Sequence, residues 1–162
     1  NIYQLTRENL KLTRETASEL LESIPPERIE KIENERSFPH PDEVLTMAEK
    51  YKKPDLCNYY CANQCPIGQE YVPEVKIKDL SQIVLKMLAS LNAMNKRKDR
   101  LIEITADGKI SDDELEDFLY IQEELERISI TVETLQLWAE KMLAAGVIDE
   151  ARYEAYRSRK KT

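Results

Sequence analysis

Glycine is scarce in this sequence, which holds only three glycines and seven prolines among 162 residues. The tight turns that join strands in β-hairpins depend mostly on glycine and asparagine, so the chain has little of the chemistry that such hairpins need. Runs rich in Leu, Glu, Lys and Ala favour helices joined by short connections instead. Because 41% of the residues are hydrophobic, enough to bury a core, we expect a folded, all-α protein without a sheet.

Long hydrophobic runs are also missing. No apolar stretch approaches the roughly 20 residues that span a bilayer, and the opening residues NIYQ lack the charged start and the apolar stretch of a signal peptide. Three cysteines are too few for a disulfide framework in a chain of this size, and their odd number fits a reducing compartment. We therefore expect a cytoplasmic protein with free thiols and no membrane partner.

The chain is acidic, with a formal net charge of -7, and neither of its halves has an excess of positive charge. Residues 1–55 hold nine Lys or Arg against twelve Asp or Glu, and residues 56–162 hold fifteen against nineteen. General binding to nucleic acids or anionic membranes needs a positive potential. Any nucleic-acid binding must therefore depend on a few locally placed basic residues.

The first 65 residues are predicted to form five short helices. Thr13 can cap a helix that starts at the next residue, because its side-chain oxygen can accept from the free backbone N–H groups. Pro25 keeps the residue before it extended, whereas Pro26 suits the first position of the next helix, where its missing N–H costs nothing. Ile29 and Ile32 then face inward. The predicted helices cover residues 2–11, 14–22, about 25–34, 41 to before Pro54, and 55–65.

The second half has longer periodic segments. Apolar residues keep helical spacing from Leu80 to Ile102 and again from Leu115 to Met142, on either side of the stretch ADGKISDDE. This pattern predicts a long, coiled-coil-like antiparallel hairpin, followed by a short C-terminal helix capped by Asp149. We expect a domain of residues 1–65, a linker of residues 66–78 and a hairpin region of residues 79–162. The apolar surface left on the hairpin either forms a homodimer or is the hairpin's own core.

The phrase LTRETASELL...IPPERIEKIENERSFPHPDEVLTMAEKY, with this order of short helices, resembles the XRE or lambda-repressor-like (Cro-type) helix-turn-helix DNA-binding domains. The matching motifs are residues 12–15, which open the second helix, residues 29–34, which close the third, and residues 41–45 with Ala48. The resemblance covers about residues 2–60. It implies a sequence-specific transcription regulator that acts as a dimer on double-stranded DNA, with residues 25–34 as the recognition helix in the major groove.

Departures from the family pattern shape the expected DNA-reading surface. Glu22 or Ser23, and Glu35, stand where the family commonly has glycine, at positions where a positive φ suits glycine. Glu27 can accept only from a base amino group such as that of cytosine, so specific reading is expected to depend on Arg28 and Lys31. The candidate DNA-binding residues are Arg14, Glu27, Arg28, Lys31, Arg36 and Ser37. The alternative is a protein-interaction module that keeps the fold without specific DNA binding.

Three cysteines, Cys57, Cys61 and Cys65, recur every four residues and would share one face of a continuous helix. Three thiolates could bind a metal ion, but no fourth ligand is evident in the sequence, where His40 is the only histidine. Small, weakly polar side chains also suit a helix packed closely against a neighbour. The cysteines are thus metal-site candidates, redox-sensing candidates or packing residues.

No other motif predicts a site. Residues 103–114 partly resemble a calcium-binding EF-hand loop, but Glu103 and Thr105 replace two of its usual ligands, and a capping box of Ser111 and Glu114 explains the same residues. No nucleophile paired with a base, no glycine-rich phosphate loop and no pair of catalytic carboxylates is evident. We therefore expect no enzymatic activity and no cofactor.

Overall fold

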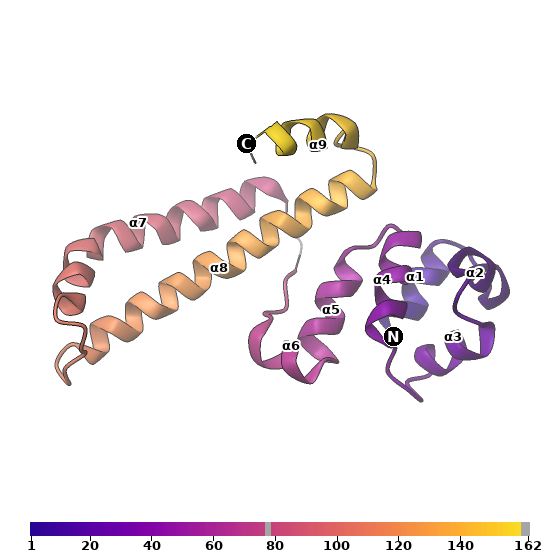
Figure 1. Cartoon of the computed structure of the whole chain (residues 1–162), viewed down its shortest axis with the longest axis horizontal. Coiled ribbons are helices and arrows are strands. Elements are labelled where there is room, and N and C mark those ends of the chain that lie inside the picture. Colours follow the sequence, from indigo (N-terminus) through magenta and orange to yellow (C-terminus); the bar gives the residue numbers. More distant parts are fainter. Residues whose placement is uncertain (77–78, 160–162) are drawn as a thin grey trace. The chain divides into compact units, whose positions relative to one another are not determined.

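The computed structural model describes residues 1–76 and 79–159. The end of the predicted linker, residues 77–78, and the last three residues of the predicted hairpin region lie outside the described part. The described residues form nine α-helices and no strand (Figure 1), so the predicted all-α class is confirmed. No helix among them combines the length and the apolar character needed to cross a membrane.

The chain divides into two compact units. The first comprises Asn1–Glu74 together with the end of the chain from Ala139, and the second comprises Val75–Trp138. The boundary after Glu74 falls inside the segment that was predicted as a linker. Part of that segment is helical, since α6 spans Pro66–Tyr71. The C-terminal helix α9, Glu150–Arg159, belongs to the first unit, and Asp149 caps it by accepting from the Arg152 backbone N–H at 2.7 Å.

Five short helices occupy the N-terminal segment in which five were predicted. Thr13 caps the second helix as predicted, since its hydroxyl oxygen accepts from the Thr16 backbone N–H at 3.2 Å. Pro26 occupies the first turn of the third helix, with Pro25 extended before it. The five helices are α1, Ile2–Asn9; α2, Arg14–Leu21; α3, Pro26–Glu33; α4, Pro41–Lys50; and α5, Asp55–Asn63.

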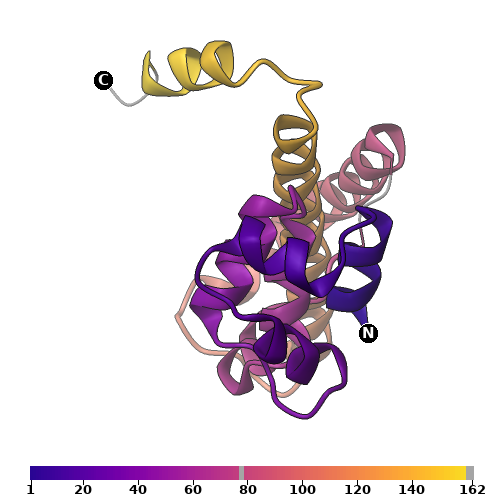
Figure 2. The same cartoon turned by 90° about the vertical axis from the view of Figure 1, so that its right-hand side faces the viewer.

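These helices enclose one apolar core. Each contributes to it, from Tyr3 of α1 to Leu56 of α5, and Figure 2 shows them, coloured indigo to magenta, facing the viewer. The predicted inward residues Ile29 and Ile32 are both 1% exposed. The buried residues of the cluster are Tyr3, Ala17, Leu21, Ile24, Ile29, Ile32, Val44, Met47, Ala48, Tyr51 and Leu56.

Helices of this unit end at residues other than glycine that have positive φ angles. Four such residues have positive φ angles of 54–60°: Lys11, Glu22, Glu35 and Lys52. After Glu35, the Arg36 backbone N–H donates to the Lys31 carbonyl at 2.9 Å, which is the closing bond of a Schellman motif. Of the positions where the family pattern commonly has glycine, residue 22 or 23 and residue 35, Glu22 and Glu35 do have positive φ angles.

The second unit is built on two long helices, α7 (Leu80–Thr105) and α8 (Leu115–Ala144), which pack side by side in antiparallel directions (Figure 1). The last turns of α8 belong to the first unit. Near the loop between the helices, Arg100 pairs with Asp117 at 2.7 Å and the Arg97 guanidinium lies 3.9 Å from the centre of the Tyr120 ring. The predicted long helical hairpin is present.

The loop between α7 and α8 contains the contact predicted for a capping box. The Glu114 carboxylate accepts from the backbone N–H and the hydroxyl of Ser111, at 3.0 and 2.6 Å. Helix α8 itself begins one residue later, at Leu115. Gly108 in this loop has a φ of 71°, which suits a residue without a Cβ.

Candidate nucleic-acid interface

Helices α2 and α3 are joined by only four residues, 22–25, and contact each other. The inner face of α3 is buried through Ile29 and Ile32, whereas Glu27 and Lys31, one turn apart, are exposed on its outer face. The helix predicted over residues 25–34 is present as α3, Pro26–Glu33. Within the described residues, no acidic side chain forms an ion pair with Lys31.

A buried ionic cluster links α1, the start of α2 and the end of α3. Glu33 is bound by Arg7 at 2.6 Å (Nε to Oε1) and by Arg14 at 2.9 Å (Nε to Oε2). The Glu33 side chain is only 1% exposed, that of Arg7 9% and that of Arg14 33%. Burial acts to raise the pKa of Glu33, but hydrogen bonds from both arginines and their charges outweigh it and hold this pKa below its usual range. Arg14 is therefore partly engaged inside the fold.

Sequence reasoning missed Arg7 and Glu33 as members of this cluster. The helical period does carry one signal, because Glu33 follows Ile29 and Ile32 at spacings of four and one and so lies on the buried side of α3. A carboxylate on a buried face needs a cationic partner. The sequence could not show which of its basic residues would supply it.

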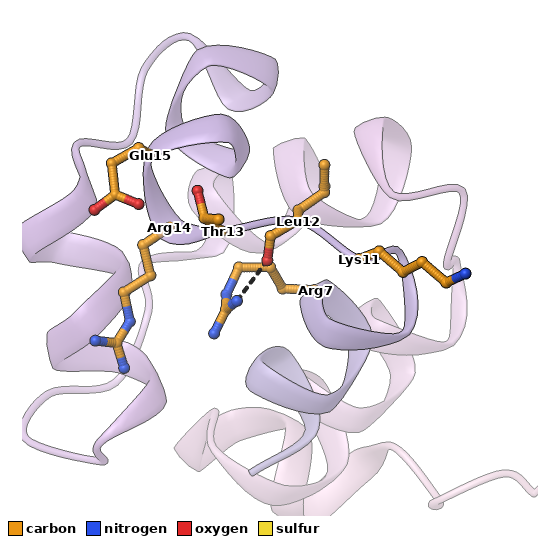
Figure 3. A pocket seen from close by; sticks show the side chains of 6 residues that line it. All are labelled: Arg7, Lys11, Leu12, Thr13, Arg14 and Glu15. Carbon is orange, nitrogen blue, oxygen red and sulfur yellow. Dashed lines mark hydrogen bonds between the residues drawn. The ribbon is translucent and has the colours of Figure 1, made fainter.

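An open pocket of about 430 Å³ lies beside this cluster. Its lining comes from the end of α1, the connection and the first turn of α2: Arg7, Lys11, Leu12, Thr13, Arg14 and Glu15. Figure 3 shows the Arg7 side chain reaching the Leu12 carbonyl, to which its Nη1 donates at 2.6 Å. Three of the lining residues are basic and one is acidic, but Arg7 and Arg14 are paired with Glu33, so among the described residues Lys11 is the lining cation without an ion pair.

Arg28 is held by partners inside the first unit. Its Nε and Nη2 donate to the two carboxylate oxygens of Glu43 at 2.7 and 2.6 Å, and its Nη1 donates to the Ser37 hydroxyl at 2.6 Å. Nη2 also donates to the Phe38 carbonyl at 3.0 Å. A bidentate arginine–carboxylate pair fixes geometry as well as charge. Arg28 and Ser37, both predicted DNA contacts, thus bind each other and anchor the loop between α3 and α4.

Arg36 has a different environment from Arg28. Its side chain is 67% exposed and lies 3.7 Å from Glu30, at the long end of ion-pair distances. The six predicted contact residues therefore divide into two groups. Arg14, Arg28 and Ser37 are engaged within the fold, whereas Glu27, Lys31 and Arg36 lie on its surface.

The three cysteines do not share one continuous helix. Helix α5 ends at Asn63, and Cys65 instead precedes the first residue of α6 in an extended conformation. Cys57 packs against the apolar core, and burial raises the pKa of its thiol. A Cβ at Gly68 of α6 would lie 2.0 Å from the Cys61 carbonyl oxygen, so α5 and α6 approach closely there. Within residues 1–76 and 79–159, no group of three or more His, Cys, Asp or Glu could hold a metal ion.

Comparison of the chain with protein-family models, with curated proteins and with solved structures finds no match in any of the three.

Proposed function

We propose that the chain is a sequence-specific DNA-binding transcription regulator that acts as a dimer, with α3 in the major groove. The observation that carries this proposal is the α2–α3 pair, whose four-residue connection has the length found in helix-turn-helix motifs. In such motifs the first helix crosses the DNA backbone and the N-terminal part of the second meets the base edges. The resemblance of residues 2–60 to Cro-type domains supports the same assignment.

The contacts with DNA are assigned to the basic residues that the fold leaves accessible. Lys31 lies on the outer face of α3 and Arg36 follows that helix, so both can reach bases or phosphates. Lys11 and the partly exposed Arg14 flank the N-terminus of α2, whose free N–H groups favour a phosphate. Glu27 can accept from a base amino group.

Arg28 is assigned a positioning role. Its bonds to Glu43, Ser37 and Phe38 hold the segment after α3 against that helix, and this segment carries Arg36. An Arg28→Lys variant keeps the charge but loses the bidentate pair. We expect it to lower thermal stability and to weaken DNA binding without changing the preferred sequence. A changed sequence preference at unchanged stability would show that Arg28 reads bases directly.

The proposed dimer joins two such modules through the helical hairpin of residues 79–145. Each protomer would then place one recognition helix on one half-site, because half-site spacing follows the symmetry of the protein dimer.

The test is a titration of the purified chain against a pool of random-sequence duplexes at two salt concentrations, followed by sequencing of the retained DNA. We expect enrichment of a two-part site and an affinity that falls steeply as salt rises, because phosphate contacts release counterions. Absence of binding at low salt would overturn the proposal.

A matched pair of variants locates the interface. Lys31→Glu with Arg36→Glu should weaken binding to the enriched site at least about ten-fold and reduce its salt dependence by about two phosphate contacts. Lys76→Glu with Lys109→Glu makes the same change in net charge at two other exposed positions and should leave binding within about two-fold. Equal losses in the two variants would mean that net charge, and not the α3 surface, controls binding.

One observation favours a second candidate, a protein-interaction module that uses the same helices. Arg28, expected to be a main reading residue, is engaged within the fold, and exposed Glu27 near the start of α3 opposes phosphate. If this second function is correct, the chain retains DNA only at the background level, and Lys31→Glu with Arg36→Glu does not change that level. The titration therefore separates the two functions.

A further inference from the structure

The hairpin leaves an apolar stripe exposed on each of its two helices. On α7 the stripe contains Leu88 and Leu91, which are 54% and 46% exposed. On α8 it contains Leu115, Leu125 and Val132, which are 48%, 51% and 41% exposed. We call these five residues the hairpin stripe. Contiguous exposed apolar side chains on a protein surface mark an interaction site.

The two halves of the hairpin stripe lie on the same face of the hairpin. Leu91 directly follows buried Ser90, and on α8 Leu125 and Val132 directly follow buried Glu124 and Thr131. Each stripe is therefore rotated by about 100° from the hairpin's own interior, in the direction of the helix turn. Because α7 and α8 are antiparallel, these equal rotations bring both stripes to one side.

Charged residues are rare on this face. Helix α8 carries nine charged residues, yet the positions of its stripe at heptad spacing, residues 115, 118, 122, 125, 129, 132 and 136, hold none. On α7 the corresponding positions, residues 84, 88, 91, 95, 98 and 102, hold one, Lys98 near the loop. A charge-free seam repeating every seven residues is typical of helices that pack against other helices.

The two helices carry opposite charge beside this seam. Helix α7 has five basic and two acidic residues, whereas α8 has seven acidic and two basic residues. The basic cluster of residues 96–100 lies level with the acidic first half of α8, because Arg100 pairs with Asp117 and Arg97 stacks on Tyr120. Opposite charges are thus concentrated near the same end of the hairpin.

We infer that the hairpin stripe is covered by the hairpin of a second copy of this chain, in a four-helix bundle where each α7 lies against the partner's α8. The twofold axis runs along the bundle and keeps equal levels of the two hairpins together. The basic loop end of each α7 then lies against the acidic first half of the partner's α8. Four exposed residues of these two segments, Lys96, Lys98, Glu123 and Glu126, form no ion pair within the described residues of one chain.

Charge favours this arrangement over the competing one. If the axis ran across the bundle, α7 would lie antiparallel to the partner's α7, and the loops of the two hairpins would point to opposite ends. The basic cluster of residues 96–100 would then face the part of the partner's α7 that carries only Lys86, and it would lose its acidic complement. This inference specifies the dimer in the proposed function, but it depends on no DNA contact, and its test uses no DNA.

The first experiment is sedimentation equilibrium of the full chain over a range of concentrations. We expect a dimer that becomes monomeric, with a dissociation constant raised at least about 100-fold, when Leu91→Lys and Leu125→Lys bury two charges in the seam. The matched control is Leu5→Lys with Leu45→Lys, two exposed leucines of the first unit, 58% and 63% exposed, which should leave the dimer intact. A wild-type chain that stays monomeric would overturn the inference. A monomer is also the result expected if the first unit of the same chain covers the hairpin stripe.

A charge exchange tests the pairing of α7 with the partner's α8. Lys96→Glu with Lys98→Glu, and separately Glu123→Lys with Glu126→Lys, should each weaken self-association at least about ten-fold. An equimolar mixture of the two variants should recover a heterodimer, because each changed helix then meets its complement. Failure of the mixture to associate would overturn this geometry. A dimer that behaves as expected but binds no DNA would overturn the proposed function and leave this inference standing.

Discussion

The two units of the molecule bury their apolar residues to different extents. In the first unit, eleven residues of α1–α5 and their connections form one closed cluster with exposed fractions of 7% or less. The interior of the second unit mixes Ile83, Ile104 and Ile121 with buried Glu124, while leucines of the hairpin stripe remain about half exposed. Three-dimensional packing of short helices completes a core, whereas two long helices cover only one side of each other.

The same difference holds for the buried carboxylates of the two units. Glu33 in the first unit is bound by two arginines that are themselves partly or almost fully buried. Glu124 in the second unit pairs at 2.5 Å with Arg127, whose side chain is 63% exposed. Removing one member of an ion pair is strongly destabilising when the other member is buried, because its charge is then left unpaired in the interior. The effect is small when the other member is exposed to water.

The largest expected effect follows from removing Glu33. Glu33→Leu leaves buried Arg7 with only the half-exposed Glu8, at 3.7 Å, as an acidic neighbour, so we expect the free energy of unfolding of the first unit to fall by about 3–5 kcal/mol. Urea unfolding followed by far-ultraviolet circular dichroism would measure this loss. Fluorescence of Trp138, the only tryptophan, follows the second unit in the same samples. Glu30→Leu on the more exposed side of α3 is the control, with a change within about 0.5 kcal/mol.

Acid should weaken the first unit through the same ionic contacts. The pKa values of Glu33 and Glu43 are lowered because hydrogen bonds to arginine outweigh the effect of burial. A carboxyl with a lowered folded-state pKa contributes stability above its unfolded-state pKa of about 4.3 and loses it as the pH falls through the folded-state value.

We therefore expect the unfolding free energy of the first unit to drop between about pH 5 and pH 3. The drop should be smaller in a chain that carries Glu33→Gln and Glu43→Gln, which is already less stable at neutral pH. Urea titrations at three pH values would measure both. An equal drop in the two chains would mean that other carboxyl groups cause the acid sensitivity.

The opposite sign is expected at the buried glutamate of the hairpin. Glu124→Leu removes a carboxylate from the interior and leaves Arg127 in water, so the second unit should gain about 1 kcal/mol. Trp138 fluorescence during urea unfolding at fixed protein concentration would report the gain. Glu133→Leu, at an exposed position of α8, is the control and should change stability by less. A lower stability of the Glu124→Leu variant would show that this carboxylate makes a stabilising contact beyond its ion pair with Arg127.

Local structure was predictable from the sequence because its causes lie within a few residues. The Thr13 cap and the helix start at Pro26 each follow from neighbouring side chains and backbone geometry. The sequence pattern did not predict the start of α6, because a proline such as Pro66 suits the end of a helix. A proline also suits the first turn of the next one, and Pro66 occupies that position.

The environment of the candidate site was less predictable. Arg28 and Glu43 are 15 residues apart, and Arg7 and Glu33 are 26 residues apart. Periodicity shows which side of a helix a residue occupies. It does not show which residue of another helix the side chain will bond, because that depends on how the helices pack. Arg28 therefore looked available for base reading in the sequence, and the structure shows it bonded to Glu43 and Ser37.

The smallest expected effect concerns the scarce glycines. Glu35 ends α3 with a φ of 57°, a conformation that costs a residue with a Cβ about 1–2 kcal/mol, partly offset by the entropy that glycine loses on folding. Glu35→Gly should therefore stabilise the first unit by about 0.5–1 kcal/mol. Glu19→Gly, inside α2, should instead cost about 1 kcal/mol. Thermal unfolding of both variants tests this contrast, and a loss in both would mean that the Glu35 side chain, and not its backbone angle, determines the stability of this helix end.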